Sequence, residues 1–163
     1  EIAQCLVGSE MCIRDSHKYN QIYTSEQAFF DDLEQMNSII KAQTGNDASI
    51  IRFPGGSSNT VSKDYCPGIM TQLVNDVTAR GLLYCDWNVS SGDANSKPIS
   101  TEQVVQNVIS GVQSHNVSVV LQHDIKDFSV NAVEQIIQWG QANGYTFLPL
   151  TTSSPMSHHR VNN

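Results

Sequence analysis

Three stretches of the sequence place residues that can do chemistry directly after short apolar runs. "IRFPGGSSN" carries Arg52 and Gly55, "CDWNVSSGDA" spans Cys85 to Ala94, and "VVLQHD" ends in His123 and Asp124. An imidazole beside a carboxylate is suited to proton transfer. A charged residue followed by a Pro-Gly-Gly turn presents backbone groups rather than side chains. With His17, which precedes the first predicted helix, these residues form a candidate active site.

Each of these residues also has an ordinary structural interpretation. His123 alone could be a hydrogen-bonded histidine of the core, Arg52 could form a surface ion pair, and the glycines could be no more than a turn. Trp87 could contribute packing alone. Their placement after consecutive strands favours a shared site, because parallel strands bring their carboxyl ends to one face of an α/β protein.

Hydrophobic periodicity predicts the elements that must position these residues. Apolar residues at helical spacing predict four helices, and short β-branched or aromatic runs predict four strands. We expect helices to begin at the Thr24–Gln27 capping box, Pro67, Ser100 with Gln103, and Ser129, and glycine stops at Gly45, Gly81 and Gly144. The predicted strands are Ser49–Phe53, Leu82–Trp87, Val117–Gln122 and Tyr145–Leu150.

This helix–strand alternation, repeated about four times, predicts an α/β fold with parallel strands and outer helices. Four units are too few for a closed eight-fold barrel, so the chain is either a small open sheet or part of a barrel. Residues 17–150 form one predicted domain. Residues 151–163 form a tail without periodicity.

The composition excludes several classes of partner. Of 163 residues, 39% are hydrophobic and 15% charged, and the net charge is −7. An acidic chain is not expected to bind nucleic acid or an anionic membrane surface. No apolar run approaches the ~18 residues of a membrane span. Cys66 and Cys85 could pair, but we favour the alternative that both are partly buried thiols.

The first sixteen residues, "EIAQCLVGSEMCIRDS", differ from the rest. They have neither helical nor strand periodicity, and no basic region precedes an apolar stretch as it would in a signal peptide. "CLVGSEMCIRDS" looks like a translated sequencing adapter. We therefore interpret residues 1–16 as a segment foreign to the native protein.

Four motifs resemble, in order and spacing, those of the NodB-homology polysaccharide deacetylases, carbohydrate esterase family four. They are "RFPGGSSN", "DWNVSSGDA", "VVLQHD" and "WGQANGYTFLPL". "SHKYNQIYTSEQAFFDDL" is similar to the stretch after that family's second motif. The resemblance runs from His17 to the C-terminus and is strongest to peptidoglycan N-acetylglucosamine deacetylases of Gram-positive bacteria. It implies a partial distorted (β/α) barrel, a polysaccharide substrate, and an extracellular or cell-surface location.

The resemblance also implies a divalent metal, usually zinc, which one aspartate and two histidines hold. A second aspartate would act as general base on a water molecule. His17 matches the second of the two histidines. Arg52 matches the arginine that orients the base.

Other implied roles concern the substrate and the transferred proton. Gly55 stands where the family presents an oxyanion-binding N–H, and Leu121 stands where a side chain lines the acetyl pocket. His123 matches the general acid. Asp93 matches the carboxylate that tunes this histidine.

The chain departs from the family pattern in three places. The Thr-Phe-Asp-Asp motif, which supplies both the metal aspartate and the base, is absent, and Ile13 stands where the first metal histidine is expected. Ala94 replaces the usual tryptophan of the fourth motif, a part of the substrate pocket that Trp87 could supply instead. The metal site is therefore incomplete in this chain.

The functional hypothesis is metal-dependent hydrolysis of N-acetyl groups on an N-acetylglucosamine polymer, such as peptidoglycan or a chitin-like polymer, by the parent protein. This chain is expected to be inactive, because one of three ligands cannot hold zinc in a catalytic site. Two alternatives stay open. One is a non-catalytic glycan-binding or scaffold module, and the other is a serine esterase that uses Ser57, Asp93 and His123. "PGGSSN" is not the G-x-S-x-G elbow that such an esterase would favour.

Overall fold

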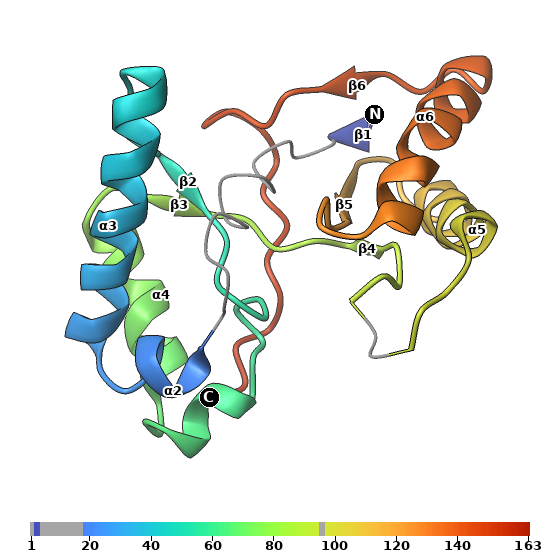
Figure 1. The fold of residues 1–163 in the computed structure, drawn as a ribbon. Coiled ribbons are helices and arrows are strands. Elements are labelled where there is room, and N and C mark those ends of the chain that lie inside the picture. Colours follow the sequence, from blue (N-terminus) through green and yellow to red (C-terminus); the bar gives the residue numbers. More distant parts are fainter. Residues whose placement is uncertain (1, 4–17, 95–96) are drawn as a thin grey trace. The chain divides into compact units, whose positions relative to one another are not determined.

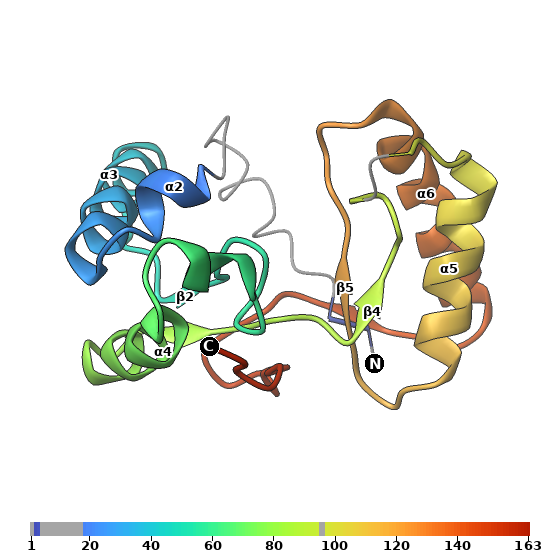
Figure 2. The ribbon, with the colours of Figure 1, turned by 90° about the horizontal axis from the view of Figure 1, so that it is seen from below.

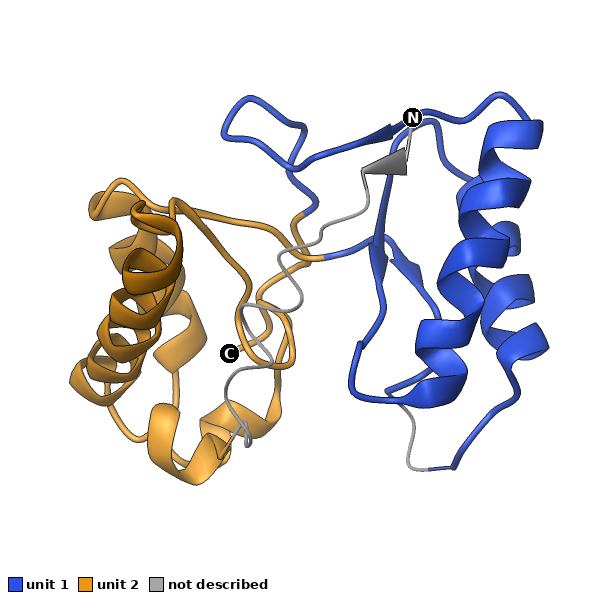
Figure 3. Ribbon diagram, turned by 45° about the horizontal axis from the view of Figure 1, so that its top comes forward, with its two compact units in different colours: residues 1–12, 87–157 blue, residues 13–86, 158–163 orange. Residues whose placement is uncertain are grey.

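The structure, a computed structural model, describes residues 2–3, 18–94 and 97–163 (Figure 1). The chain divides into two compact units, one of residues 1–12 and 87–157 and the other of residues 13–86 and 158–163 (Figure 3). Helices and parallel strands occur in both units, which confirms the predicted mixture of helix and parallel strand.

The first unit contains a four-stranded sheet in the order β4–β5–β1–β6, and all three pairings are parallel. Two helices lie side by side on the same side of β4 and β5 (Figures 1 and 2). The elements are β1 Ile2–Ala3, β4 Val89–Ser90, α5 Thr101–Gln113, β5 Ser118–Leu121, α6 Asp127–Ala142 and β6 Phe147–Leu148.

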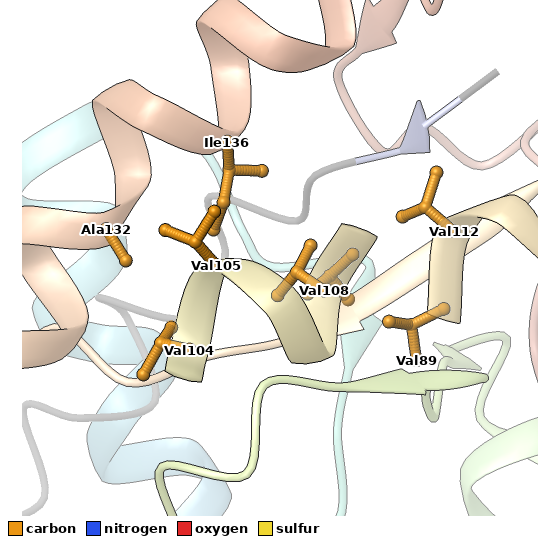
Figure 4. Close-up of a cluster of buried hydrophobic side chains, with 8 residues drawn as sticks. Val89, Val104, Val105, Val108, Val112, Ala132 and Ile136 are labelled. Carbon is orange, nitrogen blue, oxygen red and sulfur yellow. The ribbon is translucent and has the colours of Figure 1, made fainter. Parts of the chain in front are cut away.

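Valines of α5 form the centre of the core in this unit (Figure 4). They pack against Val89 of β4 and against Ala132 and Ile136 of α6. A Cβ atom on Gly111 would lie 2.5 Å from Cγ1 of Val89, so only glycine lets α5 approach β4 this closely. This packing fixes β4 and β5, and with them the loops that follow each strand.

The second unit pairs two short parallel strands and packs helices against them. Ile50 pairs with Leu83 and Ile51 with Tyr84. The apolar faces of α3 and α4 are buried, as their sequence spacing predicts. The elements are α2 Tyr19–Ile22, α3 Glu26–Thr44, β2 Ile50–Ile51, the 3₁₀ helix η1 Val61–Asp64, α4 Ile69–Ala79 and β3 Leu83–Tyr84.

Two of the predicted helix starts are wrong. Ser25 rather than Thr24 caps α3, since its hydroxyl accepts a hydrogen bond from the Ala28 N–H, while the Thr24 hydroxyl donates to the preceding turn. Ser129 does not begin α6, which starts at Asp127. The Ser129 hydroxyl faces inward, where it donates to the carboxylate of Asp93.

The start predicted at Pro67 is also wrong, but the Ser100 start and the glycine stops agree with the pattern. Ser100 caps α5 by accepting from the Gln103 N–H, as predicted. Gly45, Gly81 and Gly144 follow three of the helices with φ of +78°, +76° and +78°. The helix expected at Pro67 begins two residues later, at Ile69.

The strands are shorter than predicted, and β1 and β4 were not predicted. Cys66 and Cys85 are both thiols, as we favoured, and the Cys85 S–H donates to the Asp86 carbonyl at 3.3 Å. None of the helices in the described ranges is long and apolar enough to cross a bilayer.

Candidate functional site

The carboxylate of Asp93 and the imidazole of His123 meet at the ends of two neighbouring strands. Asp93 lies in the loop after β4, and His123 lies two residues after β5. Because β4 and β5 are adjacent and parallel, these loops leave the sheet at the same edge. Nδ1 of His123 lies 2.8 Å from Oδ1 of Asp93, and the His123 backbone N–H donates to Oδ2 at 2.6 Å.

This contact fixes the protonation of the histidine ring. An ionised carboxylate only accepts hydrogen bonds, so Nδ1 of His123 must carry the proton that is donated to Asp93. Nε2 is then the nitrogen that can gain or lose a proton. The His123 side chain keeps about a fifth of its surface exposed, at 20%, whereas that of Asp93 keeps 1%. The arrangement is therefore a histidine held by a buried anion.

Ser129 and Lys126 complete the surroundings of Asp93. The Ser129 hydroxyl donates to Oδ2 of Asp93 at 2.6 Å, and the Lys126 ammonium donates to the Asp93 backbone carbonyl. Burial by itself would raise the pKa of Asp93, but hydrogen bonds from His123 and Ser129 outweigh it and hold that pKa well below its ordinary value. Asp93 is therefore an anion throughout the physiological range.

Two further predicted residues belong to the same unit. Leu121, the last residue of β5, is buried, and Trp87, which precedes β4, is half-buried. Leu121 is two residues from His123 along the strand direction. The roles of Leu121 and Trp87 at a substrate pocket stay predictions.

Arg52 and Gly55 belong to the second unit, so their meeting with Asp93 and His123 at one site stays a prediction. Arg52 follows β2 and is half-buried. No ion-pair partner for its guanidinium occurs among the described residues. Gly55 is exposed and has φ of +77°. Within the described ranges its N–H has no hydrogen-bond acceptor.

The turn around Gly55 is closely packed. The Gly56 N–H donates to the Phe53 carbonyl at 2.7 Å. A Cβ atom on Gly55 would lie 2.6 Å from the Tyr19 hydroxyl and 2.8 Å from Nδ2 of Asn59. Glycine is therefore required here by its positive φ and by its neighbours.

The described residues do not fit a metal site. No group of three His, Cys, Asp or Glu side chains that could hold an ion occurs within residues 2–3, 18–94 and 97–163. His17, the predicted metal ligand, and Ile13 lie outside the described residues. The described ranges can therefore supply hydrogen bonds and a proton to a reaction, but not a set of metal ligands.

Sequence reasoning missed Ser129 as a partner of Asp93, because a serine before an amphipathic run is also a typical helix cap. It also missed Asp86, whose carboxylate is buried. Asp86 follows β3 in the same way that Arg52 follows β2. A charged residue at a predicted strand end is the signal that could have drawn attention to it.

Comparison with protein-family models finds no match. Among curated proteins, a Bacillus cereus peptidoglycan-N-acetylglucosamine deacetylase is 27% identical over 136 residues, which cover 81% of this chain and 46% of the relative. The chain thus spans about half the length of that relative.

Two solved structures are similar over most of the chain. The catalytic domain of a peptidoglycan N-acetylglucosamine deacetylase from Eubacterium rectale is 99% identical with a TM-score of 0.90, and the match covers 91% of this chain and 67% of that one. A polysaccharide deacetylase from Bacillus cereus is 26% identical with a TM-score of 0.71, over 88% of this chain and 66% of its own.

Proposed function

Because the chain belongs to the peptidoglycan N-acetylglucosamine deacetylases of carbohydrate esterase family four, we propose that the whole protein removes N-acetyl groups from an N-acetylglucosamine polymer. Peptidoglycan is the expected polymer, since the relatives from Eubacterium rectale and Bacillus cereus carry it in their names. A chitin-like polymer is the alternative substrate. The enzyme would work outside the cell or at its surface, where such polymers lie.

The observation that carries this proposal is the pair formed by His123 and Asp93. In amide hydrolysis a water oxygen bonds to the carbonyl carbon, the C–N bond breaks, and the leaving nitrogen takes up a proton. Protonated at both nitrogens, His123 keeps Nδ1–H on Asp93 and can give its Nε2 proton to the leaving amine. The products are acetate and a free glucosamine amine.

The Gly55 N–H is the proposed donor to the oxyanion of the tetrahedral intermediate. Gly55 is exposed as a residue, and its N–H lacks an acceptor within the described ranges. A donor that is already oriented stabilises charge that develops only in the transition state. Leu121 and Trp87 are proposed to contact the acetyl group and the sugar, and Arg52 is proposed to orient a base aspartate that this chain lacks.

We also propose that the whole protein requires a divalent metal, with zinc the expected ion, and that His17 is one ligand. The other two ligands would come from the aspartate and histidine that this chain lacks. We further propose that the chain is part of a distorted (β/α) barrel, and that residues 1–16 are foreign to the native protein. The match to deacetylase domains supports the proposed barrel.

The geometry of Ser57 does not favour a serine esterase. Its hydroxyl donates to the Asp86 carboxylate at 2.5 Å, and its side chain is fully buried. A nucleophilic serine is expected to be accessible and to donate to a basic imidazole. A serine-directed phosphonate that labels the protein at Ser57 would restore this alternative.

Acetate release tests the proposed function. The Eubacterium rectale catalytic domain and this chain are incubated with N-acetylated peptidoglycan and with chitin oligomers. We expect the domain to release acetate, a chelator to abolish the release, and this chain to release none. Activity of the domain with chelator present would contradict the metal requirement. Glycan binding by the domain without acetate release would favour the non-catalytic alternative.

A further inference from the structure

We propose that Asp86 is a positioning residue which, together with the C-terminal segment 158–163, holds the Pro54–Ser57 turn in the conformation that exposes the Gly55 N–H. The inference deepens the proposed function, because it rests on the role proposed for Gly55. Sequence periodicity predicts no role for the Asp86 carboxylate or for the C-terminal segment.

The Asp86 carboxylate joins three separate segments of the second unit. Oδ1 accepts from the Ser57 backbone N–H at 2.8 Å. Oδ2 accepts from the Ser57 hydroxyl at 2.5 Å and from the His159 backbone N–H at 2.9 Å. The end of β3, the glycine turn and the C-terminal segment therefore meet at one side chain.

Burial makes the Asp86 carboxylate depend on these hydrogen bonds. Asp86 is 1% exposed and accepts from neutral donors, with no cation within ion-pair distance among the described residues. A buried carboxylate is costly unless hydrogen bonds satisfy it. The free energy of the charge thus depends on keeping the Ser57 and His159 donors in place, which gives the turn a strong preference for one conformation.

The turn is also held on the other side of Gly55. The Pro54 carbonyl accepts from the Tyr23 hydroxyl at 2.7 Å and from Nδ2 of Asn59 at 3.0 Å. Gly55 therefore lies between two fixed points, Pro54 before it and Ser57 two residues after it. Such a backbone can present its N–H without reorganising when a negative charge develops nearby.

The C-terminal segment is tied to the same unit at several points. The His158 ring stacks on Tyr84, with centroids 4.1 Å apart, and its Nε2 lies 3.0 Å from the Tyr84 carbonyl oxygen. Nδ1 of His159 lies 3.1 Å from the Ser58 hydroxyl. These contacts place the His159 N–H against Asp86 at one end of the segment.

Asn163 fixes the other end of the segment. Its side-chain oxygen accepts from the Gly68 N–H at 2.7 Å, and its backbone oxygen accepts from the Thr71 N–H at 3.0 Å. Asn163 thus serves the first turn of α4, whose N-cap Gly68 has no side chain to do so. The segment is a strap between α4 and Asp86.

Asp86→Asn in the Eubacterium rectale catalytic domain tests the proposal. Asparagine keeps the shape but replaces one acceptor oxygen by a donor. We expect kcat to fall about 10²-fold to 10³-fold, the usual effect of losing an oxyanion donor. We expect KM to change less than about threefold, because the charge exists only in the transition state. Asp47→Asn, the same substitution at an exposed aspartate of this unit, is the control and should leave kcat unchanged.

Ser57→Ala is the milder variant if Asp86→Asn fails to fold. It removes the hydroxyl bond to Asp86 but keeps the backbone N–H bond, so we expect a smaller fall in kcat, about tenfold. Amide hydrogen exchange gives a readout besides activity. Exchange at Gly56 and Ser57 should speed up in either variant, while exchange in the middle of α3 should stay at its wild-type rate.

The outcomes separate the two proposals. If the unchanged domain releases no acetate, the proposed function fails, and hydrogen exchange still tests whether Asp86 orders the turn. If both variants lower the melting temperature but keep wild-type kcat, Asp86 is structural only and the inference is overturned. Wild-type exchange at Gly56 and Ser57 in Asp86→Asn would overturn it as well.

Discussion

His123 binds both carboxylate oxygens of Asp93, with Nδ1 lying 2.8 Å from Oδ1 and the backbone N–H donating to Oδ2 at 2.6 Å. The contact from the backbone fixes where Asp93 lies, and the contact from the ring fixes how the imidazole is turned. A rotation of the ring would break one bond without breaking the other. The geometry thus orients Nε2 by local contacts within a single unit.

His123→Ala should lower deacetylation by the Eubacterium rectale catalytic domain about 10²-fold to 10⁴-fold, the usual contribution of a positioned general acid. Metal content should stay unchanged, because His123 is not assigned as a ligand. Turnover and bound metal are measured on the same sample. His115→Ala, at an exposed histidine after α5, is the control and should keep wild-type turnover. Loss of metal in His123→Ala would mean that the proposed roles of His123 and His17 are exchanged.

Asp93→Asn should weaken the fold at neutral pH and reduce its sensitivity to acid. The pKa of Asp93 is held below its ordinary value, so its ionised form stabilises the folded state above the unfolded pKa of about 3.9. That stabilisation is lost as the pH falls from about 4 through the folded pKa. We expect the variant to lose about 1–3 kcal/mol at pH 7.

The free energy of unfolding in urea, measured between pH 7 and pH 3, checks this prediction. Wild type should lose stability below about pH 4 more steeply than Asp93→Asn. Asp124→Asn removes the exposed carboxylate that follows His123 in the sequence. Its free energy of unfolding should depend on pH as steeply as that of the wild type. Equal slopes for wild type and Asp93→Asn would contradict the proposed ionisation of Asp93.

The sequence was most informative where local rules act alone. The Ser100 cap, the glycines after three helices, and the parallel strands all follow from turn chemistry and periodicity. Ser129 was misassigned because its hydroxyl can serve a helix end or a distant carboxylate equally well. Only the tertiary structure decides between these uses, because it brings Oδ2 of Asp93 within 2.6 Å of the Ser129 hydroxyl.

In the candidate site, too, some contacts could be anticipated from the sequence and others could not. The pairing of Asp93 with His123 was implied by the family resemblance, whereas hydrophobic periodicity missed β4, the strand that precedes Asp93. The partners of Asp86 could not be anticipated, since Ser57 and His159 are separated from it by 29 and 73 positions along the chain. Contacts at such separations leave no periodic signal in a single sequence.

Gly111→Ala should destabilise the first unit although alanine favours helices. Inside an exposed helix this change would stabilise by about 1 kcal/mol. Here the new Cβ would lie 2.5 Å from Cγ1 of Val89, a short, branched side chain that cannot swing away. We expect a net loss of about 1–3 kcal/mol in urea unfolding. Ser110→Ala, at the exposed neighbouring position of α5, should be neutral or stabilising. A stabilised Gly111→Ala would show that α5 can move away from β4 at little cost.

Gly55→Ala should lower both the stability of the second unit and the activity of the Eubacterium rectale domain. Alanine at φ of +77° is strained by about 1–2 kcal/mol. Its Cβ would also displace Nδ2 of Asn59, the group that donates to the Pro54 carbonyl.

Gly45→Ala separates these effects, because φ there is +78° but no atom lies within 4 Å of the added Cβ. We therefore expect Gly45→Ala to lose only the backbone strain and to keep full turnover, whereas Gly55→Ala loses more stability and at least about tenfold in kcat. Equal melting temperatures for the two variants would mean that the contacts around Gly55 are loose, and wild-type kcat in Gly55→Ala would remove the turn from the proposed site.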